Sequence, residues 1–262
     1  MVVSLPQTMK IYLRPLQWLY CLWAFSLFIL STLLVVPFVA VFSLSPSRGG
    51  NLIYRACHYW ADSWYLLIGI RHRILPGHLP APDKRYIFIA NHISYLDIPS
   101  IMKTIRHHHF RVLGKAEMRR VPFFGYIYRR AVIMVDRSSP DQRSKSVREL
   151  KSVLRQDLSI FIYPEGTFNE THYPLKEFYD GAFRLAIETQ TPIKPMLFLD
   201  TYDRMHYRSI FSLNPGRSRA VFLPEQTVKG LTLEDLPALR SMVYRLMEAK
   251  LKEYRATWID FA

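Results

Sequence analysis

An uncharged apolar tract of 29 residues, from Leu16 to Leu44, is the strongest constraint on how this chain folds. As a helix it would measure roughly 43 Å at 1.5 Å per residue, longer than the hydrocarbon core of a bilayer at about 30 Å. A cleaved signal peptide has a shorter apolar region of about 7–15 residues, and no small-x-small cleavage site follows this tract. We therefore expect a membrane segment.

The position and orientation of this segment follow from its flanks. Pro37 leaves two arrangements open, one tilted span or a bent pair of pieces that stays in one leaflet. More basic residues follow the tract than precede it, which by the positive-inside bias places the body of the protein in the cytoplasm. They are Lys10 and Arg14 before it, and Arg48, Arg55, Arg71, Arg73, Lys84 and Arg85 after it. The sequence predicts a protein of the cytoplasmic membrane whose main domain faces the cytoplasm.

A second segment, 51–70, carries Trp60, Trp64 and other apolar residues at helical spacing. Trp and Tyr favour membrane interfaces, so the segment is either an interfacial helix or a core helix of the body. A Pro-rich stretch over 76–85 then separates two regions. We expect membrane-anchoring helices over residues 1–75 and an α/β domain over residues 76–262.

Within 76–262, short β-rich runs alternate with helical patterns. Strands are expected at 86–90, 110–113, 131–136, 158–163, 193–199 and 219–223, and helices near 97–105, 140–156, 175–190 and 233–256. This alternation predicts an α/β fold, a sheet covered by helices.

Two His residues are followed five positions later by Asp: His78 by Asp83 and His92 by Asp97. The first pair lies in the Pro-rich stretch, whereas the second directly follows an expected strand that would fix its backbone. Five residues correspond to about 500° on a helix, so a turn is needed to bring His92 and Asp97 together. An Asp bound to one ring nitrogen leaves the other nitrogen free to take a proton. The pair predicts a general base that acts on a substrate hydroxyl.

A polar turn, Tyr163-Pro164-Glu165-Gly166-Thr167, follows the strand expected at 158–163. Ligands of α/β sheets bind beyond the carboxyl ends of strands. We therefore expect this turn to lie close to His92 and to hold a substrate.

Together these segments resemble the glycerolipid acyltransferase family, PlsC-like proteins typified by the lysophosphatidic acid acyltransferases. The resemblance rests on four blocks in order. They are Asn91-His92 with Asp97; Gly114-Lys115, Pro122-Phe123-Phe124-Gly125 and Val135-Asp136-Arg137; Pro164-Glu165-Gly166-Thr167; and Thr191-Pro192-Ile193-Lys194-Pro195.

The resemblance implies a mixed sheet and transfer of a fatty acyl group from acyl-ACP or acyl-CoA to a lysolipid hydroxyl. The implied acceptor is 1-acyl-sn-glycerol-3-phosphate, which gives phosphatidic acid. His92 would deprotonate the hydroxyl and Asp97 would hold the imidazolium. The head group would be bound by Glu165, Gly166 and Thr167, with Arg137 and Lys115 near the phosphate. No metal or redox cofactor is implied.

Two departures from the family pattern leave the acceptor open. Phe168 and Tyr179 stand where the family usually carries cations, although phosphate is normally bound by Arg. Lys176, Arg184 or Lys194 are possible replacements. A lyso-aminolipid, such as a glycine or ornithine lipid, is the alternative acceptor, and a catalytically silent lipid-binding membrane protein is the remaining alternative.

The net charge of +14 indicates a polyanionic partner. No nucleic-acid-binding motif is present, and the apolar tract favours anionic lipid head groups or an acidic acyl carrier over nucleic acid. The run His107-His108-His109 cannot easily converge on one metal ion, so we expect a solvated loop there.

Overall fold

The computed structural model describes residues 7–45, 49–121, 124–135 and 140–260. Its helices and strands alternate along most of the chain, as the sequence predicts. The helices are α1 (Gln7–Phe42), α2 (Gly49–Leu67), α3 (Asp97–Thr104), α4 (Phe124–Ala131), α5 (Pro140–Arg155), α6 (Gly181–Thr189), α7 (Thr201–Arg204) and α8 (Leu236–Glu253), with 3-10 turns η1 (Ala116–Arg120), η2 (Ile210–Ser212) and η3 (Leu233–Asp235). The strands are β1 (Ile70–Ile74), β2 (Ile87–Ala90), β3 (Phe110–Lys115), β4 (Val132–Val135), β5 (Ser159–Ile162), β6 (Ile193–Phe198) and β7 (Gly216–Phe222).

The strands form one seven-stranded sheet in the order β1-β7-β6-β2-β5-β3-β4. Neighbouring strands are parallel throughout, except that β6 and β7 are antiparallel. The sheet is therefore mixed, and the expected α/β fold is confirmed.

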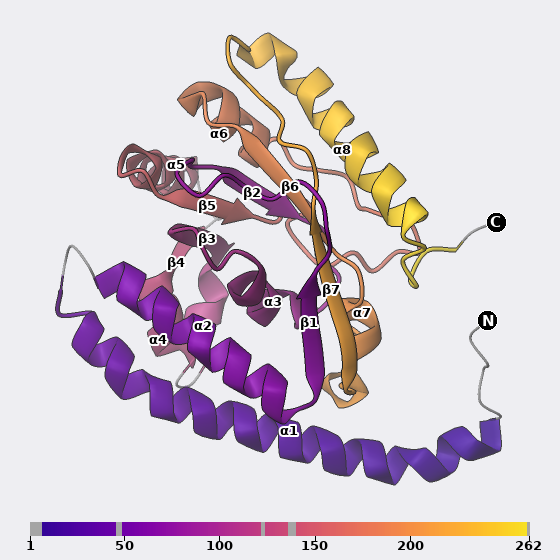
Figure 1. Cartoon of the computed structure of the whole chain (residues 1–262). Helices are drawn as coiled ribbons and strands as arrows, with labels where there is room; N and C mark the ends of the chain where they lie inside the picture. The colour runs from indigo at the N-terminus through magenta and orange to yellow at the C-terminus, as the bar shows by residue number, and fades with distance from the viewer. Residues whose placement is uncertain (1–6, 46–48, 122–123, 136–139, 261–262) are drawn as a thin grey trace.

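Both faces of the sheet are covered, which explains why the central strand β2 is apolar at every position. In β2, Ile87 and Ile89 face a core shared with α5, α6 and α8. Phe88 and Ala90 face the opposite core, which α2, α3 and α4 complete. Figure 1 shows these layers, with α8 and α6 on one side of the sheet and α1, α2 and α3 on the other.

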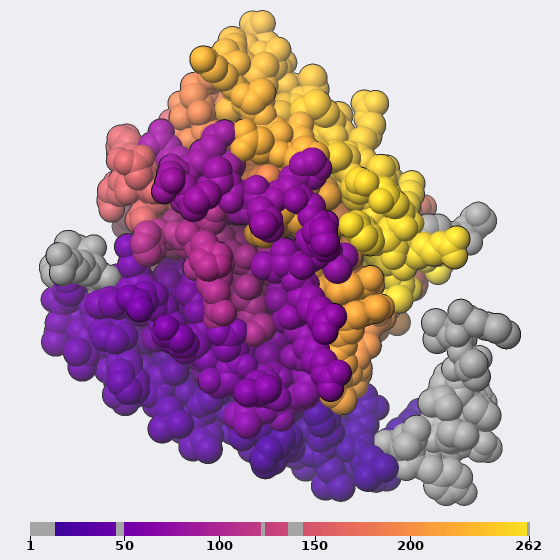
Figure 2. Space-filling model, viewed as in Figure 1, coloured from indigo at the N-terminus to yellow at the C-terminus, as the bar shows by residue number. Residues whose placement is uncertain are grey.

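The apolar tract lies in α1, a continuous helix with Pro15 and Pro37 inside it. From Arg14 to Phe42 it is long and apolar enough to cross a membrane, judged by length and composition alone. It packs alongside α2. Its other side lies at the surface of the molecule (Figures 1 and 2). The large apolar side chains exposed on it include Leu19, Trp23, Leu30, Leu34 and Val41.

Three local features differ from the sequence expectations. The sheet begins before residue 76, because β1 pairs with β7 from Ile70 onward. Helix α4 was not expected. The helix expected from residue 175 begins only at Gly181, because the preceding backbone bonds elsewhere: the Lys176 and Tyr179 N–H groups donate to Glu165 and to the Pro164 carbonyl.

Candidate active site

The loops after β2 and β5 carry the two motifs, and both leave the carboxyl edge of the sheet. Strand β2 lies between β5 and β6. The chain leaves β2 toward β3 on one side, whereas the chain leaving β5 crosses to β6 on the other side. Such a change of direction opens a crevice where ligands of α/β proteins bind.

Asn91 fixes the start of the first loop. Its side-chain amide donates to the Phe198 carbonyl at 3.0 Å and accepts from the Phe198 N–H at 2.8 Å. The buried amide thus continues the pairing of β2 with β6 one residue beyond the ladder. This holds the backbone of the next residue, His92, at the sheet edge.

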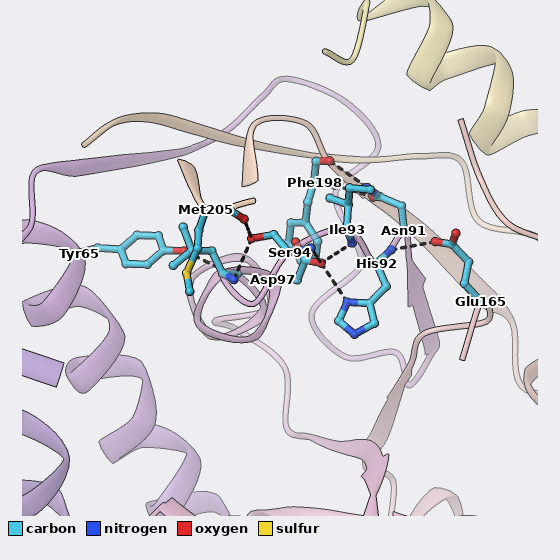
Figure 3. Close-up of polar contacts among 10 residues, drawn as sticks. Tyr65, Asn91, His92, Ile93, Ser94, Asp97, Glu165, Phe198 and Met205 are labelled. Atoms are coloured by element: carbon cyan, nitrogen blue, oxygen red, sulfur yellow. Dashed lines mark hydrogen bonds and ion pairs between the residues drawn. The ribbon is translucent and has the colours of Figure 1, made fainter. Parts of the chain in front are cut away.

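The turn that the spacing required is present, with Asp97 as the first residue of α3. The Asp97 carboxylate is fully buried, and its Oδ2 lies 2.9 Å from His92 Nδ1. The same oxygen accepts from the Ile93 and Ser94 N–H groups at 2.7 and 2.9 Å. Because these backbone donors fix the carboxylate, its bond to the ring assigns the Nδ1–H tautomer of neutral His92 (Figure 3).

The His92 ring is held between two aromatic side chains. It stacks on Tyr163, with ring centroids 3.8 Å apart and planes 10° apart, and Phe168 packs at 4.3 Å. The side chain is 16% exposed, and Nε2 has no hydrogen-bond partner among the described residues. The arrangement can therefore take a proton at Nε2 from a group that approaches the exposed part of the ring.

The buried Glu165 side chain connects the loop that follows β5 to the loop that follows β2. It is fully buried; Oε1 accepts from the His92 N–H at 2.8 Å, and Oε2 accepts from the Lys176 N–H at 2.7 Å. Burial raises the pKa of this carboxyl to about 8, against the lowering effect of the two backbone donors. Both oxygens thus contact backbone, and head-group binding by Glu165 stays a prediction.

The rest of the second motif lies beside His92. Gly166 has φ +70°, in the left-handed region that favours glycine. The Lys176 ammonium donates to Thr167 Oγ1 at 2.7 Å, and the Asn169 N–H donates to the His92 carbonyl at 2.7 Å. Lys176 is therefore a half-buried cation at the site, and of the three possible replacement cations it is the one that lies beside the second motif.

The other expected cations are placed differently. Lys115 is exposed at the carboxyl end of β3, the same edge of the sheet. Lys194 is buried near the Tyr86 ring, before the start of β2, and therefore does not face the site. Arg184 is exposed on α6. Arg137 lies outside the described residues, as do Pro122, Phe123 and Asp136 of the same block.

The expectation of a solvated loop at 107–109 is wrong for its middle residue. His107 and His109 are exposed, but His108 is buried with its ring against Tyr86 and Phe88. Burial lowers the pKa of this imidazole, which favours the neutral ring. Among the described residues, no group of three His, Cys, Asp or Glu could hold a metal ion.

Sequence reasoning also missed Tyr163 as the stacking partner of the His92 ring. A signal was present, since Tyr163 directly follows β5 and neighbouring parallel strands end at the same edge. The sequence contained no comparable sign of which face of the His92 ring it would cover.

The chain matches known acyltransferases over this region. The model of the acyltransferase family matches residues 74–199. The acyltransferase acl-2 of Caenorhabditis elegans is 30% identical over 210 residues, which cover 79% of this chain and 72% of that protein. The 1-acyl-sn-glycerol-3-phosphate acyltransferase alpha of Mus musculus is 29% identical over 189 residues, or 71% of this chain. The match spans 66% of the mouse protein's length, slightly less than two thirds.

A solved structure has the same fold. The crystal structure of the 1-acyl-sn-glycerophosphate acyltransferase PlsC from Thermotoga maritima superposes with a TM-score of 0.75, at 20% identity, over 94% of this chain and all of that one. At this identity the likeness concerns the fold alone. Together with the sheet and the two loops at its carboxyl edge, the sequence matches show that this chain belongs to the acyltransferase family.

Proposed function

We propose that this protein transfers a fatty acyl group from acyl-ACP or acyl-CoA to the free hydroxyl of 1-acyl-sn-glycerol-3-phosphate, giving phosphatidic acid. One observation carries the proposal: His92 is bound to the buried Asp97 through Nδ1 and has no described partner at Nε2. The name of the mouse relative, a 1-acyl-sn-glycerol-3-phosphate acyltransferase, supports the choice of acceptor.

In the proposed reaction, His92 Nε2 takes the proton of the acceptor hydroxyl as its oxygen attacks the thioester carbonyl carbon. The C–O bond forms, the C–S bond breaks, and the thiolate leaves with the proton returned by the imidazolium. Asp97 stabilises the imidazolium between these steps and keeps the ring in the required tautomer. The reaction needs no nucleophile from the protein, since the acceptor provides it.

The cation beside Thr167 favours a phosphate acceptor. Lys176 Nζ bonds a neutral hydroxyl at 2.7 Å and has no carboxylate within ion-pair distance among the described residues. Its backbone is tied through Glu165 to the backbone of His92, so its position relative to the base is fixed. We propose that Lys176 and Thr167 bind the acceptor phosphate, together with Lys115 and Arg137. Gly166 and Glu165 shape the turn that carries Thr167 or contact the rest of the head group.

One observation favours the alternative acceptor, a lyso-aminolipid. Phe168 stands where the family usually carries a cation. Its ring packs on the rings of His92 and Tyr95, and Tyr95 is 45% exposed. These two aromatic rings give one side of the site an apolar surface, which suits a head group with less negative charge.

An acceptor panel tests the two possibilities. Purified full-length protein in mixed micelles is offered acyl thioester with 1-acyl-sn-glycerol-3-phosphate, monoacylglycerol, or a lyso-glycine or lyso-ornithine lipid, and thiol release is measured. We expect turnover to be fastest with the phosphate. Faster turnover with a lyso-aminolipid would reject the proposed acceptor, and no turnover with any of them would reject the enzymatic function.

The same panel tests Lys176. Lys176→Met is expected to raise KM for the phosphate acceptor about 10-fold or more, as the loss of one charge-assisted hydrogen bond implies, and to leave KM for monoacylglycerol unchanged. Lys176→Arg should retain most of the affinity. Lys229→Met, at an exposed loop lysine, is the matched control. Equal losses with both acceptors would contradict a phosphate contact.

We further propose that α1 lies in the cytoplasmic leaflet and does not cross the bilayer. Its inner stripe is buried from Cys21 to Val39, about 27 Å of helix at 1.5 Å per residue. Trp60 Nε1 and Trp64 Nε1 of α2 donate to Ser31 Oγ and the Ala24 carbonyl along this stripe. A crossing helix would carry the attached body into hydrocarbon, where polar surface is costly.

Cysteine labelling tests this placement. Arg14→Cys and Ser45→Cys mark the two ends of the helix in a Cys21→Ala/Cys57→Ala background, in a bacterial host. A membrane-impermeant maleimide should label both sites in inside-out vesicles and neither in intact cells. Labelling of one end from each side would indicate a span.

A further inference from the structure

The turn between His92 and Asp97 is held by the amino-terminal helices as well as by the α/β body. Tyr65 of α2 is 1% exposed, and its hydroxyl donates to the Leu96 carbonyl at 3.2 Å. It also lies 2.9 Å from Ser100 Oγ, one turn along α3. Since the carbonyl can only accept, the Tyr65 hydroxyl accepts from Ser100. The Tyr65 hydroxyl thus bonds Leu96, the residue before Asp97, and Ser100, in the first turn of α3.

Apolar packing surrounds this contact. Leu96 is buried in an apolar cluster that joins α1 and α2 to β1 and to the segment after α7. The other buried members are Cys21, Ala24, Trp64, Tyr65, Ile68, Ile70, Met205 and Leu213. On the other side of the turn, Ser94 Oγ donates to the Met205 carbonyl at 2.6 Å. The turn is therefore fixed between α2 and the chain that follows α7.

The hydrogen bonds continue behind α3 to the edge of the sheet. Thr104 Oγ1 donates to the Ser100 carbonyl at 2.7 Å and lies 3.1 Å from His72 Nε2, while His72 Nδ1 lies 3.1 Å from Ser218 Oγ. Burial lowers the pKa of His72 to about 3, so its ring is neutral and has one N–H. Because the Thr104 proton is already used, His72 donates from Nε2 and accepts from Ser218 at Nδ1. Helix α3 is thus bonded to α2 and to His72 of β1, which is itself bonded to β7.

We propose that Tyr65 is a positioning residue for the reaction: its hydroxyl sets the first turn of α3, and thereby the position of Asp97 against the His92 ring. This inference rests on the proposed function, in which that pair is the base. Without the hydroxyl, the Leu96 carbonyl keeps only the Ser100 N–H, 3.1 Å away, and the Ser100 hydroxyl loses its acceptor, so the link from the turn to α2 is lost and the turn can shift. A displacement of about 1 Å in a reacting group lowers rates by up to about 100-fold.

Tyr65→Phe tests the proposal, because it removes the hydroxyl and retains the ring. We expect kcat to fall about 10-fold and KM for donor and acceptor to stay unchanged. The pH profile of kcat should also shift, because the position of the Asp97 carboxylate relative to the His92 ring has changed. The protein stays full-length and in micelles.

Tyr54→Phe is the matched control. Tyr54 is also in α2 and 3% exposed, and its hydroxyl donates to the Ala131 carbonyl at 2.6 Å and accepts from the Val112 N–H at 2.9 Å. This variant loses two buried hydrogen bonds away from His92, so it should lower stability comparably and leave kcat and its pH profile unchanged. Equal kcat and pH profiles in the two variants would overturn the proposal.

A His92→Ala variant separates this test from the proposed function. If His92→Ala is inactive while Tyr65→Phe behaves like Tyr54→Phe, the base is correct and the role of Tyr65 is wrong. If His92→Ala retains turnover, the assigned base is wrong, and with it the positioning role.

Discussion

His92→Ala is expected to lower thioester-dependent acylation by about 10²- to 10⁴-fold, the usual contribution of a general base. The physical reason is the position of the imidazole, which has one nitrogen bound to Asp97 and the other without a described partner. The thiol released per minute at saturating acceptor measures the effect. Circular dichroism and vesicle flotation should be unchanged, since the side chain makes one side-chain hydrogen bond.

The chain contains a matched control for this change. His78 also precedes an Asp by five positions, but it is exposed, in the stretch between β1 and β2. His78→Ala should retain full activity. Substantial turnover in His92→Ala, or an equal loss in both variants, would reject His92 as the base.

Glu165→Ala is expected to have the second large effect, on stability and activity together. The change leaves the His92 and Lys176 N–H groups without their acceptor, in a place where water is excluded. Each buried donor without a partner costs about 1–3 kcal/mol, so the free energy of unfolding should fall by about 2–6 kcal/mol. Chemical unfolding in micelles measures it. A loss below 1 kcal/mol would contradict the role in joining the loops.

Glu165→Gln and the pH dependence of stability sharpen this test. Burial raises the folded-state pKa of Glu165 to about 8, above the ordinary unfolded value. Between about pH 4.5 and 8 the folded protein therefore holds a proton that the unfolded chain has lost, and stability falls as pH rises, by up to about 1.4 kcal/mol per pH unit. Glu165→Gln does not titrate, so its unfolding free energy should decline less steeply across this range. Parallel slopes would contradict the raised pKa.

Sequence patterns predicted the features whose causes are local. The strands around Phe88 and Phe161 were predicted because inner parallel strands form short, nearly continuous apolar runs. The turn from His92 to Asp97 was predicted because five residues cannot share a helical face, and Pro99 suits the first turn of a helix.

Features that depend on distant partners could not be predicted in this way. Strand β1 contains Arg71, His72 and Arg73, and it is a strand because β7 lies beside it. Helix α4 is short, and its second residue is Gly125, where a Cβ would collide with the Arg119 carbonyl oxygen. The position of Lys176 at the site depends on a bond to Glu165 across eleven residues of loop.

The packing of α1 has a consequence for how this enzyme could evolve. Cys21 and Ala24 of α1 share a buried cluster with Leu96, the residue next to Asp97. A generic apolar helix in place of α1 would leave one side of the turn beside His92 without its packing. Helix α1 is thus not an interchangeable module, and its inner stripe should drift in sequence as slowly as the core of the protein, while its exposed side is free to vary.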